Sequence, residues 1–244
     1  MGILRNLFSA KKDGKPEEMI GNVDPVCPYC AFALLKMPGK KTKCPNCKHD
    51  IYVRTRPVDG KRVLVTIQQV EALEELWAIV NGTHQEYLAK KREFEEERSR
   101  LSEHSGNAAD DRDVKWSIYN KELMKHANGA NFGLYRNTRL EMAEFLRKEG
   151  KLGDSLSTYI EILYLDLNGP QNTSGLSTDY FLPHESFVAP GIISRITNLI
   201  TKLGWTDNEV WKELERVGNI SHKALKLPLS PENAWKKMKP QIFG

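Results

Sequence analysis

Alternating apolar and polar positions near the N-terminus predict a β-hairpin. The runs IYVRTR and KRVLVT, residues 51–56 and 61–66, are rich in β-branched and aromatic side chains and are separated by the turn sequence PVDG. Two such runs on either side of a turn are typical of paired antiparallel strands. Because side chains alternate between the two faces of a strand, Tyr52, Arg54 and Arg56 are expected to share one face.

A helical period follows the hairpin directly. Thr66 and Gln69 have the spacing of a capping box, which predicts the start of a helix. Apolar positions then recur in alternating steps of three and four, and the seam reads Val70, Leu73, Trp77, Val80, His84, Tyr87, Lys91, Phe94, Arg98 and Leu101. We therefore expect one long amphipathic helix over residues 66–103, with Asn81 and Gly82 as the place for a kink.

The seam of this helix has two interpretations. Two-stranded coiled coils prefer smaller aliphatic side chains, and Trp77, Tyr87 and Phe94 are bulky for that geometry. Aromatic stripes more often face a core, so we expect the helix to pack on the C-terminal helices. A homodimer formed through residues 66–103 is the alternative.

The C-terminal half has the pattern of successive helices. Asp110, Asp111 and Asp113 suit the cap of a helix that starts near residue 114. Further helices are predicted after Asn131, on both sides of a turn at Gly150, from residue 192 to Gly204, from Thr206 to a stop before Gly218, and from Ser230 through Trp235. This pattern predicts an array of helical hairpins.

All four cysteines lie close together, as two Cys-x-x-Cys pairs separated by thirteen residues: Cys27, Cys30, Cys44 and Cys47. A tetrahedral zinc ion needs four soft ligands at about 2.3 Å, and each turn supplies two thiolates. We expect one structural zinc ion bound by these side chains. A disulfide pair or a redox motif is the alternative, although redox motifs do not normally occur as two matched turns. Metal-binding thiols indicate a reducing compartment, so we expect a cytoplasmic protein.

The two cysteine turns and the hairpin that follows them resemble the zinc-ribbon superfamily, over residues 23–65. The resemblance implies a small β module around a shared structural zinc. Ala31 stands where the family frequently has glycine. The whole chain resembles uncharacterised bacterial and phage-type proteins with an N-terminal zinc ribbon, a likeness that implies no known activity.

A second resemblance lies in the predicted hairpin between residues 140 and 166. Its packing residues have the spacing of a tetratricopeptide-type unit, with Ser155 in place of the usual alanine and no closing proline. They are Met142, Ala143, Leu146, Gly150, Ser155, Tyr159 and Ile162. An ordinary helical hairpin is the alternative. Helical hairpins stacked side by side form grooves for peptides.

These patterns together predict a mainly α protein with a small N-terminal β zinc ribbon. The predicted parts are a flexible N-terminal segment of residues 1–22, the zinc ribbon of residues 23–65, the long helix of residues 66–103 and an α-helical domain of residues 104–244. No apolar stretch approaches the eighteen or so residues that a bilayer crossing needs, so no membrane partner is expected.

Positive charge is concentrated on the ribbon. Between Lys36 and Arg62 lie nine cations and two acidic residues, a net charge of +7 in a chain whose total is +4. Basic side chains beside an aromatic ring suit phosphates and unstacked bases. We therefore hypothesise a nucleic-acid-binding surface, with a solvated face as the alternative, at Tyr52, Arg54, Arg56, Lys61 and Arg62.

The sequence contains no motif of a known catalytic class. A phosphate loop, a dinucleotide fingerprint, a nucleophile elbow and a zinc-protease motif are all missing, so we do not expect an enzyme. We expect a non-catalytic zinc-ribbon adaptor that binds a protein partner through its helical half. The alternative is a regulatory protein that binds nucleic acid through the basic hairpin.

Overall fold

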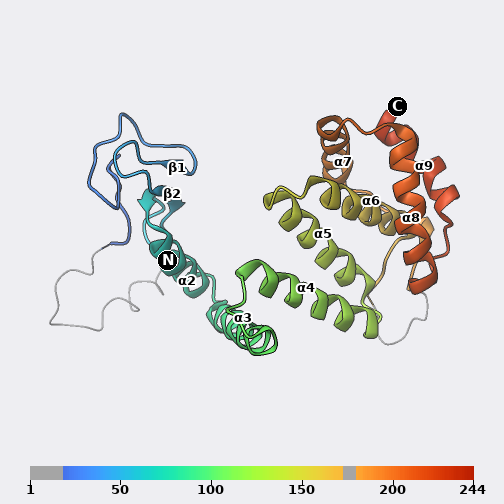
Figure 1. Ribbon diagram of the computed structural model, residues 1–244, viewed down its shortest axis with the longest axis horizontal. Coiled ribbons are helices and arrows are strands. Elements are labelled where there is room, and N and C mark those ends of the chain that lie inside the picture. The colour runs from blue at the N-terminus through green and yellow to red at the C-terminus, as the bar shows by residue number, and fades with distance from the viewer. Residues whose placement is uncertain (1–18, 173–179) are drawn as a thin grey trace. The chain divides into compact units, whose positions relative to one another are not determined.

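The computed structural model describes residues 19–172 and 180–244. Within these ranges the chain forms eight α-helices and one three-stranded antiparallel sheet, which confirms the expected mainly α class (Figure 1). The chain divides into two compact units, Met1–Glu93 and Phe94–Gly244. Most of the predicted flexible segment, residues 1–18, lies outside the described residues.

The sheet of the N-terminal unit contains the predicted hairpin. Strands β2 (Asp50–Thr55) and β3 (Arg62–Val65) pair antiparallel, with Tyr52 opposite Val65, and the short strand β1 (Thr42–Lys43) pairs with the other edge of β2. On the outer side of β3, the backbone of Asn22 exchanges two hydrogen bonds with Leu64, of 2.9 and 2.8 Å. The ordered ribbon therefore begins before residue 23.

Both faces of this hairpin are covered. One face carries Ile51, Val53 and Leu64, which pack around the four cysteines. The opposite face carries Tyr52, Val63 and Val65, which pack against the next helix. This division follows from the alternation of side chains along a strand, and it makes the hairpin the middle layer of the unit.

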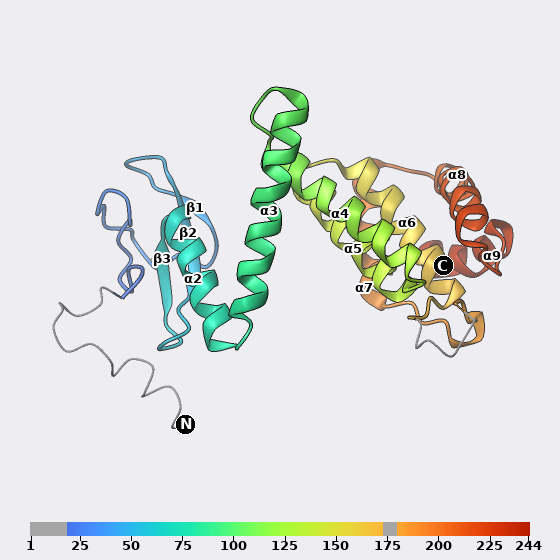
Figure 2. The same ribbon diagram turned by 90° about the horizontal axis from the view of Figure 1, so that it is seen from below.

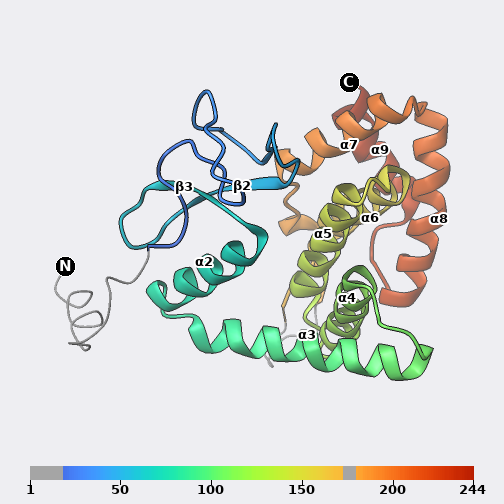
Figure 3. The same cartoon turned by 60° about the vertical axis from the view of Figure 1, so that its left-hand side comes forward.

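Helix α2 (Ile67–Val80) covers the second face, as Figure 3 shows. It begins with the predicted capping box, in which the Gln69 amide donates to Thr66 Oγ1 and the Thr66 amide donates to Gln69 Oε1. Val70 and Leu73 are buried against β3, and Trp77 Nε1 donates to the Thr55 carbonyl at 2.9 Å. The surface that receives the apolar face of α2 is thus the ribbon sheet, where we had expected the C-terminal helices.

The single helix expected over residues 66–103 is wrong, because the chain reverses after α2 and continues as α3 (His84–Ser105), visible in Figure 2. Gly82 has a φ of +72°, and the Thr83 amide donates to the Ala78 carbonyl at 2.8 Å, as in a Schellman motif. Ion pairs join the two helices between Glu75 and His84 and between Glu71 and Lys91. A continuous heptad seam is therefore absent, and with it the basis for the proposed homodimer.

The C-terminal part of α3 is attached to α4 (Asp111–Asn128) by a buried carboxylate. Glu97 is 2% exposed and accepts hydrogen bonds from Arg100, Ser117 and Lys121. The Arg100 guanidinium holds the pKa of this carboxyl well below its usual range. Asp110 caps α4, in agreement with the predicted role of the acidic cluster.

Helix α6 (Leu152–Asn168) lies in the middle of the C-terminal unit, among α5 (Phe132–Lys148), α7 (Pro190–Leu203), α8 (Asp207–Leu225) and α9 (Pro231–Phe243), as Figures 1 and 3 show. From Ser155 to Asn168 every residue except Ser157 is buried. The turn at Gly150, the capping box of Thr206 with Glu209, and the helix start at Ser230 agree with the sequence predictions.

The predicted end of a helix before Gly218 is wrong, because α8 continues to Leu225. A Cβ atom at residue 218 would lie 3.1 Å from Pro231 Cγ and 3.6 Å from Tyr164 Cε1. The glycine therefore allows α8 to approach the start of α9 and the side of α6. The last helix is also longer than expected, since α9 runs to Phe243.

Two carboxylates on the buried helix α6 are paired with arginines of α5. Glu161 forms an ion pair with Arg139, and Asp166 accepts two 2.7 Å hydrogen bonds from Nε and Nη2 of Arg136. Burial raises the pKa of Asp166 above its ordinary value, and the Arg136 guanidinium opposes that shift. These pairs let an apolar helix carry charge inside the unit.

No helix among the described residues is both long enough and apolar enough to span a bilayer.

We predict that Arg136→Met destabilises the C-terminal unit by about 3–5 kcal/mol at neutral pH, because the buried Asp166 carboxylate loses its partner. The loss of unfolding free energy should become smaller as pH falls through the raised pKa of Asp166, because the protonated carboxyl needs no cation. Urea unfolding followed by circular dichroism at several pH values measures this. The double variant Arg136→Met with Asp166→Leu should recover most of the stability, and a pH-independent loss would contradict the assignment.

Candidate functional site

The two cysteine turns have the same backbone conformation. In the first, the Ala31 amide donates to the Cys27 carbonyl at 3.0 Å, and in the second the Lys48 amide donates to the Cys44 carbonyl at 3.0 Å. Ala31 and Lys48 both adopt a left-handed conformation, with φ of 57° and 63°. Ala31 therefore adopts a conformation that favours glycine, at a cost of about 1–2 kcal/mol.

A second pair of equivalent contacts extends this similarity. The Cys27 amide donates to the Phe32 carbonyl and the Cys44 amide to the His49 carbonyl, both at 2.9 Å. The rings of Tyr29 and His49 stack at 4.6 Å, so that one side chain from each turn meets the other. The Tyr29 hydroxyl also accepts a hydrogen bond from the Ile67 amide, which joins the cysteine turns to the start of α2.

The four cysteine sulfurs meet at one point. The Sγ atoms of Cys27 and Cys47 are 3.7 Å apart, those of Cys30 and Cys44 are also 3.7 Å apart, and all four lie within 4.8 Å of one another. Disulfide sulfurs would be about 2.0 Å apart, and all four cysteines are free. Cys27 and Cys44 are buried, and the other two are partly exposed. This cluster could coordinate one metal ion.

The electrostatic environment differs between the sulfurs. A hydrogen bond from the Phe32 backbone amide is the main cause that lowers the pKa of the Cys30 thiol to about 6. Burial raises the pKa of the Cys27 thiol. Asn46 Nδ2 donates to Cys30 Sγ at 3.6 Å, which adds a second donor on the exposed side of the cluster. A metal ion would bind all four as thiolates, because the deprotonated sulfur is the ligand.

Arg56 does not belong to the hypothesised nucleic-acid surface. Its side chain is buried, with Nε and Nη2 donating to the two carboxylate oxygens of Asp59 at 3.0 and 2.7 Å and Nη1 donating to the Ile20 carbonyl. The same guanidinium lowers the pKa of Asp59 to about 2. The Arg56 side chain thus forms contacts inside the hairpin loop. The alternation of side chains along the strand predicted an accessible Arg56, and that prediction is wrong.

The remaining residues of that hypothesis do not form one stripe. Tyr52 is partly buried, and its ring has Lys41 Nζ at 4.8 Å and Arg54 Cζ at 5.7 Å from its centroid. Two cations therefore already lie over the ring that was expected to stack on a base. Arg54, Lys61 and Arg62 are exposed, which leaves three accessible cations on the hairpin.

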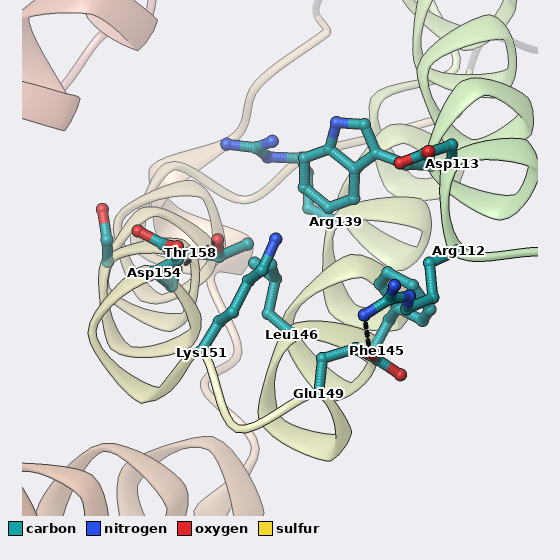
Figure 4. A pocket seen from close by; sticks show the side chains of 11 residues that line it. Arg112, Asp113, Arg139, Phe145, Leu146, Glu149, Lys151, Asp154 and Thr158 are labelled. Atoms are coloured by element: carbon teal, nitrogen blue, oxygen red, sulfur yellow. Dashed lines mark hydrogen bonds and ion pairs between the residues drawn. The ribbon is translucent and has the colours of Figure 1, made fainter. Parts of the chain in front are cut away.

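A groove in the C-terminal unit was not expected from the sequence. It consists of two adjoining cavities, of about 590 and 250 Å³, that share Arg139 and Ser157. Figure 4 shows the larger cavity, which Arg112, Arg139 and Lys151 line from separate segments. We call the two together the α5–α6 groove. Its residues come from α4, α5, α6 and α8, so no local sequence pattern could have revealed it.

The α5–α6 groove presents both signs of charge beside apolar rings. Trp116 and Phe145 line the larger cavity, and Arg112 lies 3.6 Å from Glu149 at its rim. In the smaller cavity, Ile220 is an exposed apolar side chain. Such a lining suits a segment of protein that carries both polar and apolar side chains.

Comparison with protein-family models, curated proteins and solved structures finds no match to this chain. The resemblances to zinc ribbons and to tetratricopeptide units therefore rest on the residue types and spacings in this sequence. What the structure adds is that the four cysteines lie together within a small β-sheet unit.

We predict that Arg56→Ala destabilises the hairpin by about 1–3 kcal/mol, because three hydrogen bonds of a buried guanidinium are lost. Arg54→Ala is the matched control on the exposed surface and should change stability by less than about 0.5 kcal/mol. Hydrogen exchange of the β2 and β3 amides reports both effects. Equal protection in the two variants would show that the Arg56 contacts contribute nothing.

Proposed function

We propose that this protein is a non-catalytic adaptor. Cys27, Cys30, Cys44 and Cys47 hold one structural zinc ion, and the α5–α6 groove of the helical half binds a protein partner. The cysteine cluster carries the first half of the proposal, and the groove carries the second.

The sulfur positions support zinc. A zinc ion with four thiolates at about 2.3 Å places neighbouring sulfurs about 3.8 Å apart, close to the 3.7 Å separations in the cluster. Four protein ligands fill the tetrahedral coordination of zinc and leave no position for a reactive water. A zinc ion here would be structural.

The small core of the ribbon supports a structural role for the metal. Among the described residues, the fully buried apolar side chains around the cluster, apart from the cysteines, are Ile51 and Leu64. So few buried side chains do not stabilise a module of this size, and small domains of this kind depend on metals or disulfides. When bound, zinc supplies the bonds that hold the two cysteine turns together.

The extent and lining of the α5–α6 groove support a protein partner. The groove extends over two adjoining cavities that share Arg139 and Ser157, and this extent suits an extended protein segment. Trp116 and Ile220 provide apolar contacts at positions where a partner could bury them. Tryptophan and arginine are enriched at protein interfaces, and both line the groove.

The hydroxyl groups in the groove support a non-catalytic role. Ser157 and Ser221 donate to the carboxylates of Glu213 and Glu161, and Thr158 donates to the Asp154 carbonyl at 2.8 Å. None of these three hydroxyls donates to a histidine, and no histidine or cysteine lines the groove within the described ranges. A nucleophile activated by a base is the usual arrangement for covalent catalysis, and these hydroxyls serve the fold instead.

The nucleic-acid alternative is weakened by the geometry of the hairpin. Only Arg54, Lys61 and Arg62 of the hypothesised residues remain accessible, and the Tyr52 ring already contacts two cations. Three cations without a free aromatic ring provide little beyond nonspecific attraction to phosphates. We therefore favour the adaptor function over nucleic-acid binding.

We predict that the protein purified without chelators contains one zinc ion per chain, and that Cys44→Ser abolishes stoichiometric binding. His49→Ala is the control, because His49 lies beside the cluster but is not one of its ligands. Elemental analysis measures the metal. Chelation should unfold the ribbon and leave the C-terminal helices intact by hydrogen exchange. Protein that contains no zinc, or a Cys44→Ser variant that retains it, would overturn the assignment.

We predict that a partner captured from the native host and then purified binds the α5–α6 groove. Lys151→Glu and Ile220→Glu should each weaken binding about tenfold or more, because they change the charge and the apolar surface at the groove. Lys202→Glu and Met124→Glu make the same changes at exposed positions outside it and should have little effect. Calorimetric titration separates these cases. Equal weakening by both pairs, or capture of nucleic acid alone, would contradict the proposal.

A further inference from the structure

The segment between the two cysteine turns exposes apolar side chains to solvent. We call residues 32–43 the lysine loop. Leu34 and Met37 pack against the cysteine cluster and attach the loop to the ribbon. Leu35 lies between these two anchors and is fully exposed, at 107% of the reference area, and Phe32 is 40% exposed. The loop is therefore held in place while its most apolar side chain has no contact that shields it.

The charge of the lysine loop has a single sign. It contains Lys36, Lys40, Lys41 and Lys43 and no acidic residue. Lys41 pairs with Asp50 at 2.8 Å, whereas the other three ammonium groups have no ion-pair partner within the described part of the chain. All four lysines are exposed. A ligand for this loop must therefore be anionic.

The loop also forms the walls of a surface depression of about 660 Å³, which its apolar side chains and all four lysines line. Leu34, Leu35 and Pro38 contribute to its walls. The combination is an apolar surface with a rim of ammonium groups. Exposed apolar groups gathered in this way mark interaction sites in soluble proteins.

The types of residue distinguish between the anionic partners. Protein interfaces are depleted in lysine and enriched in arginine and aromatic residues, and the loop has four lysines and no arginine. Surfaces for single-stranded nucleic acid use several aromatic rings for stacking, and the loop has one, Phe32. Lysines beside exposed aliphatic side chains match an anionic lipid surface, where basic clusters bind the headgroups and apolar groups enter the acyl boundary.

We propose that the lysine loop docks the ribbon onto an anionic phospholipid membrane. Leu35 and Phe32 enter the boundary between headgroups and acyl chains, and Lys36, Lys40 and Lys43 bind the lipid phosphates and carboxylates. An apolar group and a basic cluster are combined here, and stable membrane attachment takes two such signals. The expectation that no membrane partner exists rested on the lack of a spanning stretch, and surface binding needs none. This inference goes beyond the adaptor function and does not depend on the groove.

Vesicle cosedimentation with the full-length, zinc-loaded protein tests the proposal. Vesicles that contain phosphatidylserine should bind at low salt, and phosphatidylcholine vesicles should bind far more weakly. Lys36→Glu with Lys40→Glu should reduce the partition coefficient about 25-fold or more, at about fivefold per lysine. Leu35→Ser should reduce it about tenfold.

Matched variants control for charge and exposed apolar area. Lys223→Glu with Lys237→Glu makes the same charge change at exposed lysines outside the loop, and Val58→Ser removes an exposed apolar side chain from the hairpin turn of the same ribbon. Both should bind nearly as the wild type does. Zinc content and hydrogen exchange verify that each variant keeps the ribbon folded.

Several results would overturn the membrane assignment. One is the absence of binding to phosphatidylserine vesicles at low salt, and another is equal binding to both kinds of vesicle. Competition by inorganic phosphate at low concentration would identify a site for free phosphate instead. Binding of a single-stranded oligonucleotide that the loop variants abolish, with vesicle binding unaffected, would assign the loop to nucleic acid. A dimer that Leu35→Ser dissociates would assign it to a second copy of the chain.

Discussion

The N-terminal unit depends on four sulfur atoms being held at one point. The hairpin of β2 and β3 is too small to be stable alone, and both of its faces are covered in this structure. Ile51, Val53 and Leu64 face the cysteines, whereas Val63 and Val65 face α2. The Tyr29 hydroxyl also accepts a hydrogen bond from the first turn of α2, which joins the cysteine turns to the start of that helix. The same anchoring presents the lysine loop.

The C-terminal unit follows from the burial of α6. A helix covered on every side is apolar, yet α6 carries Glu161 and Asp166, and each requires a cation from α5. The pair of Arg139 with Glu161 has a second consequence, because Arg139 lies where the two cavities of the α5–α6 groove adjoin. Stability and the shape of the proposed binding surface therefore share one side chain.

The two surfaces that we propose for binding differ in composition as well as in position along the chain. The α5–α6 groove combines both signs of charge with tryptophan, which suits a protein segment. The lysine loop combines one sign of charge with exposed aliphatic groups, which suits a lipid surface.

The sequence by itself determined the features that depend on neighbouring residues. The hairpin of residues 51–66, the capping boxes at Thr66 and Thr206 and the two matched cysteine turns were all predictable, because residue types at fixed short spacings mark each of them. Tertiary structure decided the rest. Gly218 permits a close contact with Pro231 instead of ending a helix, and Arg56 turns inward to donate to the Ile20 carbonyl. The α5–α6 groove gathers side chains from four helices. These outcomes depend on residues distant in sequence, whose approach is set by packing and not by local preference.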